Sequence, residues 1–472
     1  MTEQFRPQLP LDMPRIMGQE TEYSVMPAKT AETLGQGLLM SCLPDSVVHS
    51  NYFLSNGARF YLDVGSHPEY ATPECASGLT VAAASAAGTL IVGKTIENIV
   101  TNVFDNQSKA KLYKRTSFKG NTIASGDHEN YFMRKGLPLE QVASMVTPHL
   151  VSRIIFSGVG QLNQNGSYSL DQRTFHMSND ILSDYSTHKF RPFVLKRDEP
   201  HSKVGARLQV ISGSANMMTA PIRFRFDSTS LALRLIEHNL LPDWLQLEQP
   251  ANAMRAIASE KTSDDYEFRS KVRLKNGVQL TAPQLQYEYV SRLKKLADTG
   301  DLNDYDTSFT DQWMEMTNDA LDGKIEKWKA SIEWLAKLAL IDRYTAGRPV
   351  VTTAMKQQID LQFHEVGTNT ITSILAGNGH IAEAIDKATI AAAEITAPDN
   401  CRGRVRGIRV SQVAAGQGTT DFTNFDWSRW PLKSGVDNPS YNTLKERQGD
   451  PYCSIKDFAD DYSSRTRPTE LP

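Results

Sequence analysis

The sequence predicts an α+β fold, in which strands and helices are mixed without a regular strand–helix alternation. Strand-like runs are prominent in the first part of the chain, notably over 15–26 and 51–65. A long stretch over 280–344 instead repeats apolar residues at intervals of three and four, which is typical of amphipathic helices. Because these helices follow the strands and do not alternate with them, a doubly wound parallel sheet is disfavoured.

The individual elements follow from local patterns. The run RIMGQETEYSVM, over 15–26, alternates partly between apolar and polar residues and predicts a strand. The Asn-Gly pair at 56–57, flanked by aromatic and aliphatic residues, predicts a hairpin over 51–65. An Ala-rich and weakly charged run predicts a buried helix over about 79–103, and it is short of a confident membrane span.

Composition along the chain suggests two folded parts. The first 14 residues are polar and rich in proline, and they predict a flexible arm. A helical run over 378–396 ends just before Pro398, where the composition changes, so a domain boundary is expected there. The expected organisation is an arm over 1–14, a large domain over 15–397 and a small C-terminal domain over 398–472.

Charge and cysteine usage argue against several classes of protein. The formal net charge of −3 gives no electrostatic support for a nucleic-acid partner. The four cysteines are widely spaced and form no CxxC pair, which disfavours a structural zinc site or a disulfide framework. The N-terminus lacks the apolar core of a signal peptide. We therefore expect a reduced, cytoplasmic protein with no membrane or nucleic-acid partner.

The strongest chemical signal is a set of carboxylates beside two predicted strands. Glu20 and Glu22 are separated by one residue, so on a strand both side chains project from the same face. Asp63 and Glu69 crowd the second strand, in the run YLDVGSHPEY. Carboxylates that converge on one sheet face suit Mg²⁺, which often bridges carboxylates and nucleotide phosphates. A solvated acidic surface is the alternative explanation.

Basic and aromatic residues elsewhere could complete a nucleotide site. His128, in GDHENY, could be a ligand or a phosphate contact, although a single histidine is more often structural. Arg197, in RDEPH, could meet phosphate oxygens, as could the alternate arginines of RGRVRG (402–407) if that segment is extended. Trp427 could pack on a nucleotide base or simply in the core. No P-loop pattern is present, so a sheet face would have to bind the nucleotide.

Several motifs together resemble the family of Pup ligases and Pup deamidases. In chain order they are RIMGQETEY, NGARFYLDVGSHPEYATPEC, HENY, RPFVLKRDEPH, QIDLQFHEV and RGRVRG. The resemblance spans roughly residues 15–430. It implies a glutamine-synthetase-like large domain, similar to carboxylate–amine ligases, in which a curved antiparallel sheet backed by helices cradles ATP. It also implies a small C-terminal domain, a requirement for Mg²⁺, and a small disordered modifier, Pup, as partner.

The resemblance implies one of two activities. A ligase phosphorylates the C-terminal glutamate side chain of Pup or a Pup-like modifier, and a lysine amine of a target protein then attacks the acyl phosphate to form an isopeptide bond. The related deamidase converts a C-terminal glutamine of Pup to glutamate and removes Pup from its targets. A protein that binds the modifier without catalysis is a third hypothesis.

The resemblance also implies roles for single residues. Asp63 matches the catalytic aspartate. In a ligase it would help to deprotonate the attacking lysine, because a free pKa of about 10.4 leaves the amine mostly protonated at neutral pH. Glu20 and Glu22 match the metal ligands, and Tyr61 and Glu69 would complete the metal site. The resemblance also implies nucleotide contacts for His128, Arg404 and Arg406. Arg197 and Trp427 are added to the expected nucleotide contacts on chemical grounds alone.

The residues within the motifs indicate which branch of the family the chain resembles more. LDVGSHPEYAT is similar to the ligase branch, and the short connection over 24–56 lacks the long insertion of the deamidase branch, so a ligase is favoured. Two departures from the family pattern lie near the expected nucleotide site. The run 115–121 differs from the family's NNTD, and Gln209 stands where the family has a histidine. An amide binds a metal or a phosphate differently from an imidazole.

Overall fold

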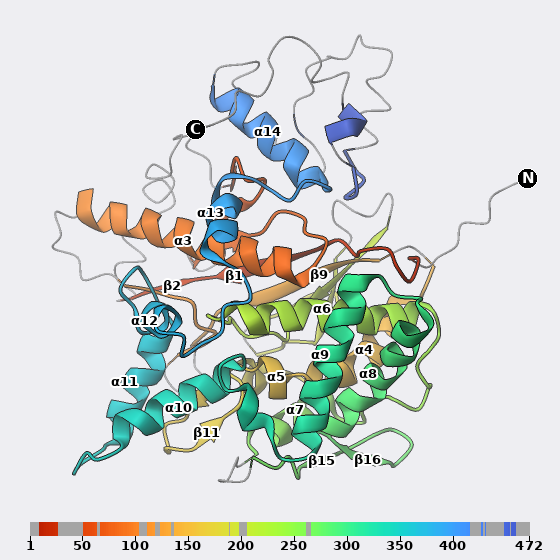
Figure 1. The fold of residues 1–472 in the computed structure, drawn as a ribbon, viewed down its shortest axis with the longest axis vertical. Helices are drawn as coiled ribbons and strands as arrows, with labels where there is room; N and C mark the ends of the chain where they lie inside the picture. The colour runs from red at the N-terminus through yellow and green to blue at the C-terminus, as the bar shows by residue number, and fades with distance from the viewer. Residues whose placement is uncertain are drawn as a thin grey trace, which may run out of the picture.

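A computed structural model of the chain has an extended sheet at its centre with most of its helices gathered on one side (Figure 1). The structure describes residues 9–26, 51–63, 67–102, 111–118, 123–133, 136–187, 189–197, 205–260, 266–415, 426–427, 430, 448–453 and 455–458. Helix α14 (Arg402–Ala414) lies apart from the main group of helices, at the top of the view (Figure 1). The expected α+β class is confirmed.

The main sheet has eight strands in the order β12-β13-β14-β9-β1-β5-β4-β3. Adjacent strands are antiparallel except for β12 and β13, which run parallel. In chain order the strands are β1 (Met17–Glu22), β3 (Asn51–Phe53), β4 (Arg59–Asp63), β5 (His67–Ala71), β9 (Asp127–Met133), β12 (Leu182–Ser183), β13 (Val194–Arg197) and β14 (Ala206–Val210).

Smaller sheets and the helices complete the described fold. A three-stranded sheet is formed by β2 (Ser24–Met26), β6 (Lys111–Tyr113) and β17 (Glu365–Val366). Two-stranded pairs are formed by β7 (Ser117–Phe118) with β8 (Ile123–Ala124), β10 (Gln161–Leu162) with β11 (Tyr168–Ser169), and β15 (Lys271–Arg273) with β16 (Gln279–Thr281). The other α-helices are α3 (Gly78–Asn102), α4 (Leu139–Ser152), α5 (Ile154–Ser157), α6 (Thr219–Glu237), α7 (Pro250–Ala258), α8 (Ala282–Thr299), α9 (Asp304–Leu321), α10 (Glu333–Thr345), α11 (Thr353–Phe363), α12 (Ile371–Gly377) and α13 (Lys387–Ile395).

The predicted hairpin joins β3 and β4 through the Asn56-Gly57 turn. The Leu54 amide donates to the Ala58 carbonyl at 2.8 Å, and the Gly57 amide donates to the Leu54 carbonyl at 2.9 Å. Gly57 has a φ of 74°, in the left-handed region that favours glycine. The amide nitrogen of the Asn56 side chain donates to the Tyr70 hydroxyl at 3.0 Å, which ties the turn to β5.

Helix α3 is a core helix, as predicted. By length and composition it could cross a membrane, but 61% of its qualifying stretch is buried inside the protein. It packs against α6 and α13 and against strands β1 and β5. Its first amide, from Gly78, donates to Asp227 of α6 at 2.6 Å, which satisfies one of the unpaired donors at the helix N-terminus.

The face of the main sheet that packs on the helices, here called the back face, carries a buried ionic cluster. Asp127 and Glu129 project from β9 and are fully buried. Arg225 of α6 binds the Asp127 carboxylate at 2.7 Å, and Arg153 binds Glu129 through both of its terminal nitrogens, one of them at 2.8 Å. Each buried carboxylate therefore has a buried guanidinium as its partner, which offsets the cost of burying the charge.

The back-face cluster also fixes strand β1. Asp127 accepts hydrogen bonds from the Gln19 side chain and from the Thr21 hydroxyl, both at 2.7 Å. Because Gln19 and Thr21 alternate with Glu20 and Glu22 along β1, these bonds hold the two glutamates toward the opposite face.

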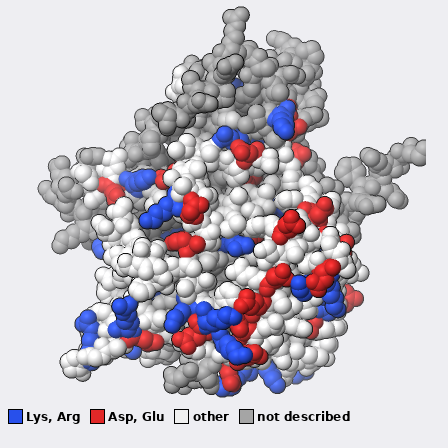
Figure 2. Space-filling model, viewed as in Figure 1, with Lys and Arg blue, Asp and Glu red and all other residues white. Residues whose placement is uncertain are grey.

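The outer surface of α8 and α9 carries charges of both signs. Lys294 of α8 lies 2.7 Å from Asp311 of α9, and Lys327 lies 2.7 Å from Glu315. Figure 2 shows acidic and basic side chains interspersed over the visible face. Interspersed charges are typical of solvent-exposed helices, and exposed pairs of this kind contribute little to stability because solvent and salt screen them.

Three local predictions need correction or narrowing. Residues 9–14 of the predicted arm are packed: Leu9 is buried, and Arg234 of α6 donates to the carbonyls of Leu11 and Met13. RGRVRG is not extended, because it forms the first turns of α14. The helix predicted over 378–396 is confined to α13. The domain boundary near 397 falls between α13 and α14 and stays a prediction.

Candidate active site on the front face of the sheet

The face opposite the helices, here called the front face, gathers the predicted carboxylates. In the strand register Glu20 pairs with His128, and Glu22 pairs with Glu69. Tyr61 of β4 also pairs with Glu69, from the other side. Side chains at paired positions project from the same face, so four adjacent strands deliver polar groups to one area.

Two overlapping groups of side chains could each hold a cation. One ligand atom from each of Glu20, Glu69 and His128 lies within 4.8 Å of the other two, and the same is true of Glu22, Asp63 and Glu69. Glu69 belongs to both groups and could therefore bridge two ions. The structure thus brings together the residues that the sequence analysis expected at the metal site, along with His128 and Asp63.

Glu69 is the buried member of this set of carboxylates and lies among like charges. It is 3% exposed, and the Tyr61 hydroxyl donates to its Oε1 at 2.5 Å. Burial raises the pKa of Glu69 well above its ordinary value, and the negative charges of Glu20 and Glu22 raise it further. Burial and the neighbouring Glu69 likewise raise the pKa of Tyr61. A cation at this position would offset the crowded negative charge.

Glu20 has basic neighbours and remains ionised. His128 Nδ1 lies 3.4 Å from its Oε2, and a terminal nitrogen of Arg207 lies 3.5 Å from its Oε1. Burial alone would raise the pKa of Glu20, but the hydrogen bond from His128 and the charge of Arg207 outweigh it and lower the pKa to about 2. At neutral pH Glu20 is therefore a carboxylate, as a metal ligand must be.

Gln209, the departure from the family pattern, lies in this site. Its Nε2 donates to Glu20 Oε2 at 3.0 Å. Its side-chain oxygen is buried and has no hydrogen-bond partner in the described part of the chain. A buried acceptor without a donor is costly, and a hard cation or its bound water would satisfy it.

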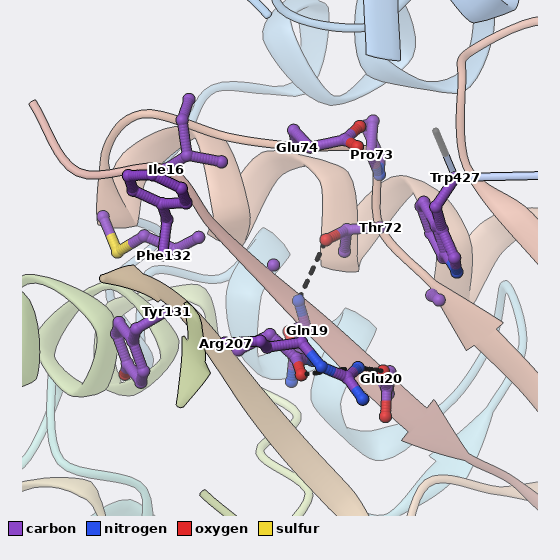
Figure 3. Close-up of a pocket in the computed structure, with 14 residues that line it drawn as sticks. Ile16, Gln19, Glu20, Thr72, Pro73, Glu74, Tyr131, Phe132, Arg207 and Trp427 are labelled. Atoms are coloured by element: carbon purple, nitrogen blue, oxygen red, sulfur yellow. Dashed lines mark hydrogen bonds and ion pairs between the residues drawn. The ribbon is translucent and has the colours of Figure 1, made fainter. Parts of the chain in front are cut away.

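A pocket opens beside Glu20, between the front face and Trp427 (Figure 3). Its enclosed volume is about 60 Å³, and the space around it is open to solvent. Ile16, Phe132 and Trp427 supply apolar wall, and Glu20 and Arg207 supply charge. The sequence analysis missed Arg207. The signal was present, because Arg207 and Gln209 alternate in the strand ARLQV and so share a face.

Two of the expected nucleotide contacts point elsewhere. Arg406 is fully buried, and one of its terminal nitrogens binds Glu74 Oε2 at 2.7 Å, so its guanidinium is directed at Glu74. Arg404 is partly exposed and lies 3.5 Å from the exposed Asp399. Arg197, by contrast, pairs with Arg207 in the strand register and so projects from the front face, where its side chain is exposed. The rest of RDEPH lies outside the described residues. The helical form of RGRVRG explains the positions of Arg404 and Arg406, because a helix directs these two side chains to different sides.

The run 115–121, the second departure from the family pattern, supports the fold. Arg115 binds the buried Asp360 carboxylate at 2.7 Å, and the Thr116 hydroxyl accepts from the Ala215 amide at 2.9 Å. Residues 119–121 lie outside the described part of the chain.

Known proteins match nearly the whole chain. A family model described as Pup-ligase protein matches residues 39–430. The chain is 32% identical over 444 residues to the Pup--protein ligase of Nocardioides sp. (strain ATCC BAA-499 / JS614), a match that covers 88% of this chain and 92% of the relative. It is 31% identical over 458 residues to the Pup--protein ligase of Geodermatophilus obscurus, covering 92% and 98%.

Solved structures are similar over the same extent. The complex between the prokaryotic ubiquitin-like protein Pup and its ligase PafA aligns with a TM-score of 0.76 and 26% identity, covering 96% of each chain. The Pup ligase PafA in complex with ADP aligns with a TM-score of 0.72 and 27% identity, covering 89% of this chain and 93% of that one. With the front-face carboxylates in place and matches of this length, the chain belongs to the Pup ligase family.

Proposed function

We propose that this protein joins the C-terminal glutamate of Pup, or of a Pup-like modifier, to lysine amines of target proteins in a reaction that consumes ATP and requires Mg²⁺. Membership of the Pup ligase family and solved relatives bound to Pup and to ADP support this function. The structural observation that carries it is the convergence of Glu20, Glu22, Asp63 and Glu69 on one sheet face beside a pocket.

The front face fits Mg²⁺. The ion prefers oxygen ligands, and Glu20, Glu22 and Glu69 would hold it, while the Tyr61 hydroxyl orients Glu69. The unpaired oxygen of Gln209 beside Glu20 is a further acceptor suited to a cation or its water. When bound, Mg²⁺ supplies neutralisation of the charge on the phosphate oxygens.

We place the nucleotide in the pocket beside Glu20, because aromatic and basic side chains line it. Trp427, at its rim, offers an aromatic ring on which a base can stack (Figure 3). Arg207 lines the pocket and lies 3.5 Å from Glu20, and His128 lies 3.4 Å from the same carboxylate. Phosphates bound there would meet a guanidinium fork and the metal ligands together.

The chemistry proceeds in two steps. An oxygen of the modifier's glutamate side chain attacks the γ-phosphorus of ATP, the bond to the β–γ bridging oxygen breaks, and ADP and an acyl phosphate form. The lysine nitrogen then attacks the acyl carbon, phosphate leaves, and an isopeptide bond remains. The lysine must lose a proton, and Asp63, partly exposed at the end of β4, would accept it.

We place this reaction in the cytoplasm. The described cysteines, Cys75, Cys401 and Cys453, are buried free thiols, which suits a reducing compartment.

One experiment tests the function against its alternatives. The purified protein is incubated with ATP, Mg²⁺, a lysine-rich test protein and Pup ending in glutamate, and a parallel reaction contains a Pup conjugate. Intact-mass spectrometry should show Pup added to lysines in the first reaction. Release of free Pup in the second reaction alone would identify a depupylase or deamidase. Binding of Pup without turnover in either reaction, unchanged by Asp63→Asn, would identify a non-catalytic binding protein.

A further inference from the structure

Arg406 of α14 joins three separate segments of the chain. Its side chain is fully buried, and it donates to the Gly57 carbonyl of the β3–β4 turn at 2.6 and 3.2 Å. It binds both carboxylate oxygens of Glu74, at 2.7 and 3.3 Å. It also donates to the main-chain carbonyl of Trp427 at 3.0 Å. Its guanidinium donors are thus directed at protein groups.

The same guanidinium also contacts the Trp427 ring. Its central carbon lies 4.8 Å from the centroid of the Trp427 ring and 5.0 Å from that of Phe53. The two rings meet edge to face, with centroids 5.2 Å apart. A buried cation over an aromatic face is attracted by it, so Arg406 holds both the backbone and the ring of Trp427.

Two glycines fix the distance between α14 and the turn. A Cβ on Gly403 would lie 2.9 Å from Glu74 Oε2, and a Cβ on Gly407 would lie 2.9 Å from the Gly57 nitrogen. The helix can therefore approach the turn closely only because neither position has a side chain. This close approach places the Arg406 side chain at a set depth between the turn and Trp427.

We propose that Arg406 is a positioning residue that holds the Trp427 ring as a wall of the pocket and thereby sets the affinity for the nucleotide base. Trp427 lines the pocket from the C-terminal part of the chain (Figure 3). Arg406 is not among the lining residues and would act on a bound nucleotide through its contacts with Trp427. The inference rests on the proposed function, because it requires that the pocket bind ATP or ADP.

The inference predicts coupling between the two residues. Lysine at 406 keeps a positive charge near Glu74 but lacks the planar fork that reaches Gly57, Glu74 and Trp427 at once. Arg406→Lys and Trp427→Ala should each weaken ADP binding about tenfold, the scale of one base–aromatic stack. The double variant should bind ADP no more weakly than Trp427→Ala alone, because Trp427→Ala already removes the ring that Arg406 positions.

Arg402→Lys is the matched control. Arg402 also lies on α14 and binds the same carboxylate, with its Nε 2.5 Å from Glu74 Oε1, and it donates to the Gln448 carbonyl. The control makes the same chemical change one helical turn away and leaves the contacts between Arg406 and Trp427 in place. It should lower the melting temperature while changing the Kd for ADP by less than about twofold.

The measurement is calorimetric titration of ADP with Mg²⁺ into each variant, with the melting temperature recorded to confirm folding. Additive effects of Arg406→Lys and Trp427→Ala, or equal weakening by Arg402→Lys, would overturn the inference and leave Arg406 as a general docking residue. Unchanged ADP binding in Trp427→Ala would also overturn it. Failure of the wild-type protein to bind ADP would instead contradict the proposed function.

Discussion

The two faces of the main sheet both bury carboxylates, but they balance the charge differently. On the back face, Asp127 binds Arg225 at 2.7 Å, and Glu129 binds Arg153 through two nitrogens. On the front face, Glu69 is as deeply buried, and its hydrogen bond comes from the neutral Tyr61 hydroxyl. Both sets are buried in the same sheet, on strands β9 and β5 with only β1 between them, so burial alone does not distinguish them.

The pKa shifts express this difference. Burial alone would raise the pKa of Glu129, but Arg153 and Arg225 outweigh it and lower the pKa below its ordinary value. For Glu69 burial and the neighbouring carboxylates act in the same direction and raise the pKa. A carboxylate with an internal cation stabilises the fold, whereas one without such a partner is suited to a cation from outside. Four substitutions test this division.

The largest effect is expected from Asp63→Asn on the front face. The amide cannot accept the lysine proton, so conjugation should fall by about 10²–10⁴-fold. ADP binding and the free energy of unfolding should stay near the wild-type values, because the Asp63 side chain is partly exposed and asparagine keeps the backbone pairing with His67. Initial rates of Pup conjugation measure the effect. A wild-type rate would show that another group takes the proton.

Glu129→Gln on the back face should lower stability and not chemistry. Removing the charge leaves Arg153 and Arg225 buried with less compensation, and breaking a buried pair costs about 3–5 kcal/mol. Denaturant unfolding of the metal-free protein measures the change. A loss below about 1 kcal/mol would mean that the back-face cluster is not held by charge pairing.

Glu22→Gln should weaken Mg²⁺-dependent ADP binding by roughly 10–100-fold, the scale seen when metal sites lose a supporting group. The amide oxygen of glutamine can still accept from the Gly126 amide, which donates to Glu22 at 2.7 Å, so the strand should stay in place. Titration of Mg²⁺ at fixed ADP measures the shift, with Glu129→Gln as the control. An unchanged Mg²⁺ midpoint would remove Glu22 from the metal site.

The smallest effect is expected from Glu69→Gln, which should raise the free energy of unfolding, whereas Glu129→Gln should lower it. In the absence of metal this change should stabilise the protein at neutral pH, since folding must either bury the Glu69 charge among like charges or take up a proton, and a glutamine amide needs neither. Because the folded-state pKa of Glu69 is raised, the folded state binds more protons, and wild-type stability should fall as the pH rises above the unfolded value of about 4.3.

Unfolding in EDTA across this pH range should show a flatter profile for Glu69→Gln than for the wild-type protein. With Mg²⁺ present the variant should instead be less stable than the wild-type protein, because it lacks a metal ligand. Destabilisation of the metal-free variant would show that the front face is internally balanced, and the contrast between the two faces would fail.

The front-face carboxylates could be predicted because their signal is local. Glu20 and Glu22 are two residues apart, and a strand places them on one face whatever lies around it. The Asn56-Gly57 turn is also a local signal, and the hairpin follows from it. The α+β class followed from the separation of strand-like and helical periodicities along the chain. In each case the determining residues are close in sequence.

The role of Arg406 could not be predicted in this way. The spacing in RGRVRG allows a strand, which would align Arg404 with Arg406, and a helix, which aligns Arg402 with Arg406 instead. The choice depends on Glu74, which lies 332 residues from Arg406. The packing of residues 9–14 likewise depends on Arg234, more than 200 residues away, with a separation of 223 from Leu11.

The strict alternation along β1 has a genetic consequence. Insertion or deletion of one codon within β1 would turn Glu20 and Glu22 to the back face and Gln19 and Thr21 to the front face. A single mutation would thus remove the metal ligands and bury two unpaired carboxylates beside Asp127. Natural variation in chain length should therefore be confined to the connections between strands. In a library of single-codon insertions and deletions, β1 should be among the least tolerant segments of the gene.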